Sequence, residues 1–86
     1  MKDARTKYAE NRKDIKVLID CVRVSLDGHA REAEAEAGNW GFVGDLADAR
    51  QDLKGLLMRF IVGRPGLETE IKASRWIEDH LAGLRI

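Results

Sequence analysis

The sequence has few of the residues that build catalytic, metal-binding or disulfide-bonded sites. A single cysteine, Cys21, excludes an intrachain disulfide framework and is typical of a reducing compartment, so we expect a cytoplasmic protein. The two histidines, His29 and His80, form neither a His-x-x-x-His nor a Glu-x-x-His pair of the kind that ligates zinc or di-iron. The sequence also contains only two serines, so we do not expect a nucleophilic side chain and a general base to lie together in a catalytic site. We therefore expect no enzymatic activity, no metal and no cofactor.

An excess of charge of one sign is also missing, because 15 basic side chains balance 15 acidic ones. Nucleic-acid-binding domains normally carry a basic excess, so this balance disfavours nucleic acid as a partner. The N-terminal residues contain no apolar run of the kind found in secretory signals. The longest apolar stretch, residues 53–63, is interrupted by Lys54 and Arg59 and is shorter than the roughly 20 residues that cross a bilayer. A membrane is therefore disfavoured as well, and surface binding by an amphipathic segment stays an alternative.

Proline and strand-like patterns are scarce, which favours an all-α fold. Pro65 is the single proline, no window combines alternating apolar and polar residues with an enrichment in β-branched residues, and strong helix formers dominate. Glycine-rich runs near residues 38–45 and 63–66 divide the chain into helices of about 3–37, 45–62 and 65–84, in a single helical domain spanning 1–86. The apolar stripe of the first helix crosses Gly28 in phase, so we predict one long helix there, with a break at Gly28 as the alternative.

The apolar stripes of the three helices also predict how they pack. Short connections favour antiparallel neighbours, so we expect an antiparallel helical hairpin with a long first helix plus a third packed helix, similar to a three-helix bundle. Trp40 and Phe42 lie between the first two stripes, and we expect them to seal the end of the hairpin, with Trp40 buried. The predicted core consists of Leu18, Val22, Leu46, Leu53, Leu56, Phe60, Ile71, Ile77 and Leu81.

A second apolar row on the first helix does not fit such a bundle. Val17, Cys21 and Val24, continued by Gly28, lie about 150° around the helix from the main stripe. Two arrangements would bury this row: the first helix lies between the other two, or another chain covers it. We predict the second arrangement, a homodimer in which the row meets its own copy, because two-fold pairing is the commonest symmetry of oligomers.

Charge is distributed unevenly along the chain although it sums to zero. Residues 1–23 carry seven basic and four acidic groups, whereas residues 24–52 carry two basic and seven acidic groups. A basic stripe on the first helix, within about 40° on a helical wheel, could follow a phosphate backbone. A solvated face whose cations pair with acids on a neighbouring helix is the simpler interpretation. The stripe consists of Arg5, Arg12, Lys16 and Arg23.

Three aspartates at the start of the second predicted helix, Asp45, Asp48 and Asp52, are interpreted as capping and pairing groups rather than a metal site. The whole pattern predicts a small non-enzymatic helical protein-interaction module that pairs with itself or with another protein. The alternatives are a small nucleic-acid-associated regulator that uses the basic stripe, and a membrane-surface amphipathic protein.

Overall fold

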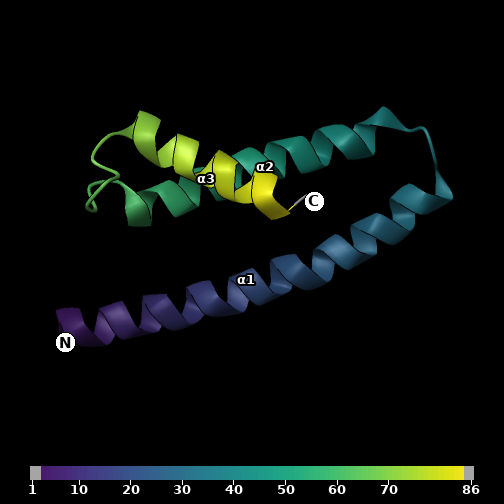
Figure 1. Ribbon diagram of the computed structural model, residues 1–86. Coiled ribbons are helices and arrows are strands. Elements are labelled where there is room, and N and C mark those ends of the chain that lie inside the picture. The colour runs from purple at the N-terminus through teal and green to yellow at the C-terminus, as the bar shows by residue number, and fades with distance from the viewer. Residues whose placement is uncertain (1–2, 85–86) are drawn as a thin grey trace. The chain divides into compact units, whose positions relative to one another are not determined.

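The computed structural model describes residues 3–84, and within this range it contains three helices and no strand (Figure 1). The helices are α1 (Ala4–Ala35), α2 (Trp40–Ile61) and α3 (Glu70–Leu84). The predicted all-α fold class is confirmed, and so is the packing of α3 against the helix that precedes it.

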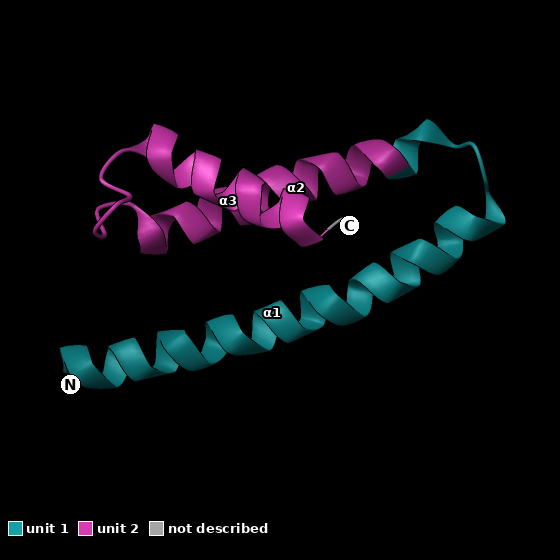
Figure 2. Ribbon diagram, in the orientation of Figure 1, with its two compact units in different colours: residues 1–42 teal, residues 43–86 magenta. Residues whose placement is uncertain are grey.

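The chain divides into two compact units, residues 1–42 and residues 43–86 (Figure 2). Unit 1 contains α1 and the first residues of α2. Unit 2 contains the rest of α2 together with α3. The single domain over residues 1–86 that the sequence predicts stays a prediction.

In unit 1, α1 begins at a cap and continues without interruption through Gly28. The carboxylate of Asp3 accepts a hydrogen bond from the backbone N–H of Thr6 at 2.8 Å, which satisfies one of the free donors at the helix start. That bond to the charged carboxylate lowers the pKa of Asp3. The helix ends where the N–H of Glu36 donates to the carbonyl of Ala33, and Gly38 follows with a φ of 91°. At 1.5 Å per residue, its 32 residues extend about 48 Å.

The second helix begins at Trp40, five residues earlier than the sequence predicts. The side chain of Asn39 accepts a hydrogen bond from the N–H of Gly41 at 2.9 Å, and this bond supports the helix start. A Cβ at Gly41 would lie 3.0 Å from the same Asn39 oxygen. A residue larger than glycine would therefore crowd the capping hydrogen bond. The sequence predicts that the glycines of this segment break the helix, but Gly41 and Gly44 lie inside α2.

In unit 2, α2 and α3 form a helical hairpin connected by a tight loop. Gly63 and Gly66 adopt φ angles of 96° and 85°, and the backbone N–H of Gly63 donates a hydrogen bond of 2.8 Å to the carbonyl of Leu67. Pro65 lies within this loop and does not start the helix, which begins at Glu70 instead of the predicted residue 65. The reason is a cap further along the chain, because the Thr69 hydroxyl accepts from the N–H of Lys72 at 3.2 Å.

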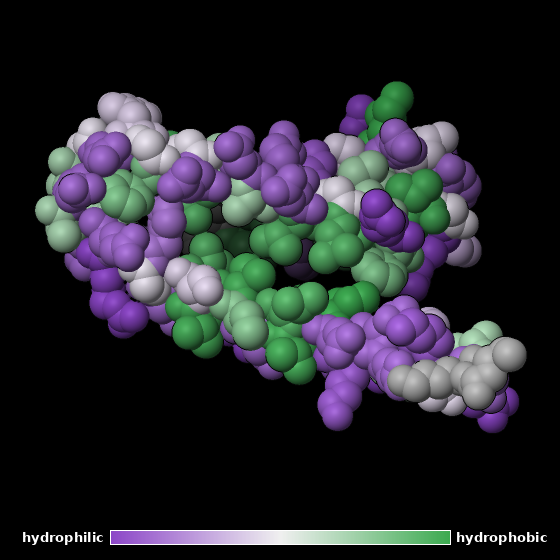
Figure 3. All heavy atoms as spheres, turned by 180° about the vertical axis from the view of Figure 1, so that it is seen from behind, coloured by the Kyte–Doolittle hydropathy of each residue, from purple (hydrophilic) through white to green (hydrophobic). Residues whose placement is uncertain are grey.

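Buried side chains within the described residues are confined to the hairpin. Ala73 and Ile77 of α3 are buried, with Ile77 4% exposed. Of the nine residues predicted to share a core, Ile77 is buried, Leu56 and Leu81 are half-buried, and the other six are exposed. The prediction is wrong for those six, and large apolar side chains are uncovered at the surface (Figure 3).

Candidate interaction surface on the first helix

None of the described residues of α1 is buried, although the helix carries apolar side chains on two sides. The main stripe includes Ile15, Leu18 and Val22, all exposed. A soluble helix normally presents one apolar sector and hides it against another element. A 32-residue helix with two uncovered apolar sides therefore has surface available for other helices.

The second side of α1 is the row formed by Val17, Cys21, Val24 and Gly28. Their spacing of four, three and four residues places them on one face of the helix. Val17 is 54% exposed, Val24 is 70% exposed, and the thiol of Cys21 is free. A shallow hollow of about 390 Å³ lies along the row and is lined by Val17, Asp20, Cys21, Val24 and Ser25.

Gly28 extends the row with a position that has no side chain. A Cβ built on Gly28 would meet no atom within 4 Å, so packing inside the unit does not require glycine there. Glycine in the middle of a helix costs about 1 kcal/mol relative to alanine. Its absence of a side chain lets another backbone approach α1 closely at this point.

The basic stripe lies on the same helix, and its charge is partly neutralised. Arg23 forms an ion pair with Asp20, with 3.2 Å between Nη1 and Oδ1. Asp20 also lines the hollow, so this ion pair borders the apolar row. Arg5, Arg12 and Lys16 are exposed on α1, as a solvated face requires.

The described residues meet neither the requirements of a metal site nor those of a membrane span. Within residues 3–84, no group of three histidine, cysteine, aspartate or glutamate side chains is placed to hold a metal ion. None of the helices in this described part of the chain is long and apolar enough to cross a membrane.

The aromatic residues near the start of α2 differ from expectation. Trp40 is 80% exposed, so the prediction of a buried indole is wrong. Because α2 already begins at this residue, Trp40 lies at the end of a helix and not inside a turn folded over the core. Phe42, and not Trp40, packs against another aromatic ring: it lies edge-to-face against His29, with 5.2 Å between the ring centroids.

One charged cluster was not found from the sequence. Glu78 of α3 accepts hydrogen bonds from Arg50 at 2.7 Å and from Lys54 at 2.9 Å, both on α2. These two bonds lower the pKa of Glu78 to about 2, and the same contact raises the pKa of Arg50. Arg50 and Lys54 are one helical turn apart, a signal for a shared face, but nothing local indicates that Glu78 is their partner.

Comparisons of the chain with models of protein families, with curated proteins and with solved structures find no match.

Proposed function

We propose that this chain is a small, non-enzymatic helical protein-interaction module that acts as a homodimer through the row on α1. The observation that carries the proposal is the exposure of Val17, Cys21 and Val24 on a helix that buries none of its described residues. Moving apolar surface out of water contributes about 25 cal/mol per Å², so pairing this row with its copy stabilises both chains. The proposed location is the cytoplasm, where Cys21 stays a thiol.

Charge supports an antiparallel arrangement of the two copies. The N-terminal part of α1 carries Arg5, Lys7 and Arg12, whereas Glu32 and Glu34 lie in its C-terminal part and Glu36 directly follows it. An antiparallel pair centred near Cys21 brings the basic end of each helix toward the acidic end of the other. Complementary charge of this kind sets orientation and disfavours the parallel pair, in which like charges meet.

Sedimentation over a range of protein concentrations tests the proposal. The wild type is expected to dimerise, while Val17→Asp and Val24→Asp are expected to stay folded and monomeric, because each places a carboxylate in the apolar contact. Val43→Asp is a matched control, since Val43 is 54% exposed like Val17 but lies on α2. A wild type that stays monomeric at high concentration contradicts the proposal, and so does a control that dissociates as readily as the two variants.

A further inference from the structure

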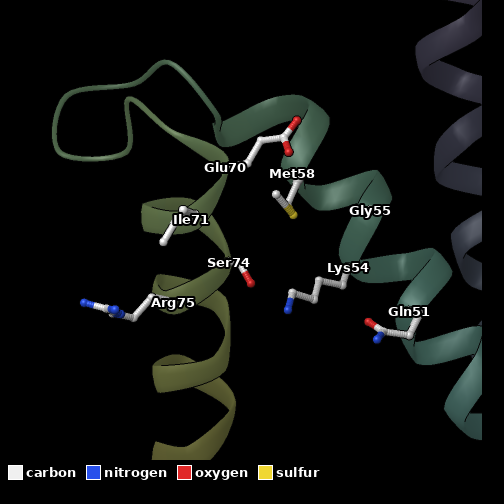
Figure 4. Close-up of a pocket in the computed structure, with 8 residues that line it drawn as sticks. All are labelled: Gln51, Lys54, Gly55, Met58, Glu70, Ile71, Ser74 and Arg75. Carbon is white, nitrogen blue, oxygen red and sulfur yellow. The ribbon is translucent and has the colours of Figure 1, made fainter.

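An open groove between α2 and α3 is separate from the row on α1. It belongs entirely to unit 2 and has a volume of about 620 Å³ (Figure 4). Both helices contribute polar and apolar side chains to it. The residues that matter most are Lys54, Gly55 and Met58 of α2 and Ile71, Ser74 and Arg75 of α3.

The residues that line the groove include two cations, Lys54 and Arg75, and one acid, Glu70. Lys54 and Arg50 share the single carboxylate of Glu78, so that cluster keeps one net positive charge. The ammonium of Lys54 has three donors, and Glu78 occupies one of them. Figure 4 shows Lys54 and Ser74 directed into the space between the helices, with Lys54 reaching from α2 toward α3.

Arg75, at the outer edge of the groove, adds a further positive charge. Arg75 extends outward from α3 in Figure 4, and among residues 3–84 no carboxylate forms an ion pair with it. Among the described lining residues, Glu70 is the acid that opposes Lys54 and Arg75. A ligand with carboxylates is therefore favoured here over a ligand with basic groups.

The other part of the groove is apolar and open. Ile71 is 74% exposed, and Met58 is a flexible thioether that adapts to irregular partners. Gly55 lies between them and Lys54 along the groove, in the interior of α2, where glycine weakens a helix. A Cβ at Gly55 would meet no atom within 4 Å, so no neighbour within the hairpin requires a glycine. The absence of a side chain at Gly55 leaves open space beside this part of α2.

We propose that this groove binds an acidic amphipathic helix of another protein. Apolar side chains of that helix lie over Met58 and Ile71, and its carboxylates lie near Lys54 and Arg75. Helices recognised in grooves use apolar anchors one turn apart, which suits an open channel between two helices. The proposal does not depend on the α1 dimer, because every residue that it uses belongs to unit 2.

Fluorescence polarisation with a defined probe tests this proposal on the full chain. The probe is a fluorescein-labelled synthetic helix with leucines on one face and glutamates beside them. The control peptide has lysine in place of each glutamate. The acidic peptide is expected to bind at least about tenfold more tightly than the basic one, with an affinity that falls as salt is added. Equal binding of the two peptides, or no binding of either, overturns the proposal.

Two matched glycine variants locate the binding site. Gly55→Leu adds a side chain to the lining of the groove, and Gly44→Leu adds the same side chain to the same helix outside it. Both side chains begin in open space, and both changes favour the helix, so both proteins are expected to fold. Peptide binding should be lost in Gly55→Leu and kept in Gly44→Leu. Equal affinity of the two variants overturns the proposed site.

Charge variants complete the test. Arg75→Glu is expected to weaken acidic-peptide binding at least about tenfold, and Glu70→Gln is expected to strengthen it, because the two residues have opposite effects on the charge of the rim. If the groove instead takes a second copy of this chain, Gly55→Leu alters sedimentation while the acidic peptide does not bind. That result also overturns the proposal.

Discussion

Arg50 of α2 donates a hydrogen bond to Glu78 of α3, with 2.7 Å between Nη2 and Oε2. The residues are 28 positions apart in the sequence, so this contact exists only when the hairpin has formed. Lys54 donates to the other carboxylate oxygen of Glu78, and the two bonds together lower its pKa from an ordinary value of 4.5 to about 2. The ionised carboxylate is therefore linked to the folded state.

The free energy of unfolding should depend on pH through Glu78. Because the pKa is lower in the folded than in the unfolded chain, the carboxylate contributes its full stabilisation above about pH 4.5, and this contribution is lost as the pH falls toward about 2. Glu78→Gln removes the titrating group, so the wild type should lose more thermal stability on acidification than the variant. Circular dichroism melts from about pH 7 to about pH 2 measure the difference.

Other acids provide the background for that comparison. The pKa of Asp3 and that of Glu68 are also lowered, chiefly by hydrogen bonds from the backbone N–H groups of Thr6 and Gly66. Both titrate in the wild type and in Glu78→Gln, so their effect cancels in the difference. An identical loss of stability in the two proteins would show that Glu78 is not coupled to folding.

The buried side of α3 should be far more sensitive to truncation than its exposed side. Ile77 is 4% exposed and Ile71 is 74% exposed, although both are isoleucines of the same helix. Ile77→Ala is expected to cost about 2 to 5 kcal/mol, from lost burial and the cavity left behind. Ile71→Ala should stay within about 0.5 kcal/mol of the wild type. Urea denaturation measures both values, and a similar cost for the two would contradict the packing of α3.

Local patterns predicted the helices better than they predicted burial. The 3.6-residue periodicity of α1 crosses Gly28 in phase, and the helix continues through that glycine because one unfavourable residue is offset by strong helix formers on both sides. The starts of α2 and α3 were misplaced because side-chain caps, Asn39 and Thr69, decide them. Glycine and proline near these positions are more conspicuous in the sequence but do not set the boundary.

Burial and the α2–α3 groove depend on contacts between helices, which local sequence patterns do not reveal. Leu53 and Phe60 belong to a regular apolar stripe on α2, yet both are exposed, because α2 turns another side toward α3. The stripe shows which residues favour burial but not which helix covers them. The row on α1 follows from spacing alone, whereas the α2–α3 groove is lined by residues of two helices, such as Lys54 and Ser74, that only the folded hairpin brings together.

The change in stability when a glycine is replaced by alanine should depend on the backbone angles of that glycine. Gly63 adopts a φ of 96° in the loop, a region that disfavours side chains, so Gly63→Ala is expected to cost about 1 to 2 kcal/mol. Gly44 is helical and a Cβ there meets no atom within 4 Å, so Gly44→Ala should stabilise the protein by up to about 1 kcal/mol. Denaturation of the two variants measures these shifts. Effects of the same sign in both would contradict the loop conformation.

The indole of Trp40 should behave as a solvent-exposed fluorophore. Trp40 is 80% exposed at the start of α2, whereas Trp76 is less exposed and stacks on His80 at 5.4 Å between ring centroids. In a Trp76→Phe background, emission from Trp40 should be red-shifted and readily quenched by iodide, because water surrounds the ring. The Trp40→Phe protein, which reports on Trp76, is the matched comparison. A blue-shifted, protected Trp40 would mean that another surface covers it.

The orientation of the proposed dimer can be determined from disulfide formation. In an antiparallel pair centred near Cys21, the residue four positions before Cys21 in one copy faces the residue four positions after it in the other. Val17 and Ser25 occupy those positions, and both line the hollow beside Cys21. In a Cys21→Ser background, Val17→Cys and Ser25→Cys chains are mixed and oxidised. We expect the mixed Cys pair to form fastest, because a disulfide needs Cα atoms within about 7 Å.

A parallel dimer gives the opposite pattern, since each position then faces its own copy. Val17→Cys chains would form disulfides with one another as fast as, or faster than, with Ser25→Cys chains. Val43→Cys in the same background is the control for random collision, because Val43 is as exposed as Val17 but lies outside the row. If Val17→Cys and Ser25→Cys, alone or mixed, oxidise only at the rate of this control, α1 does not pair through this row. Fast oxidation of the mixed pair alone would instead establish both the contact and the antiparallel arrangement that the opposite charges at the two ends of α1 favour.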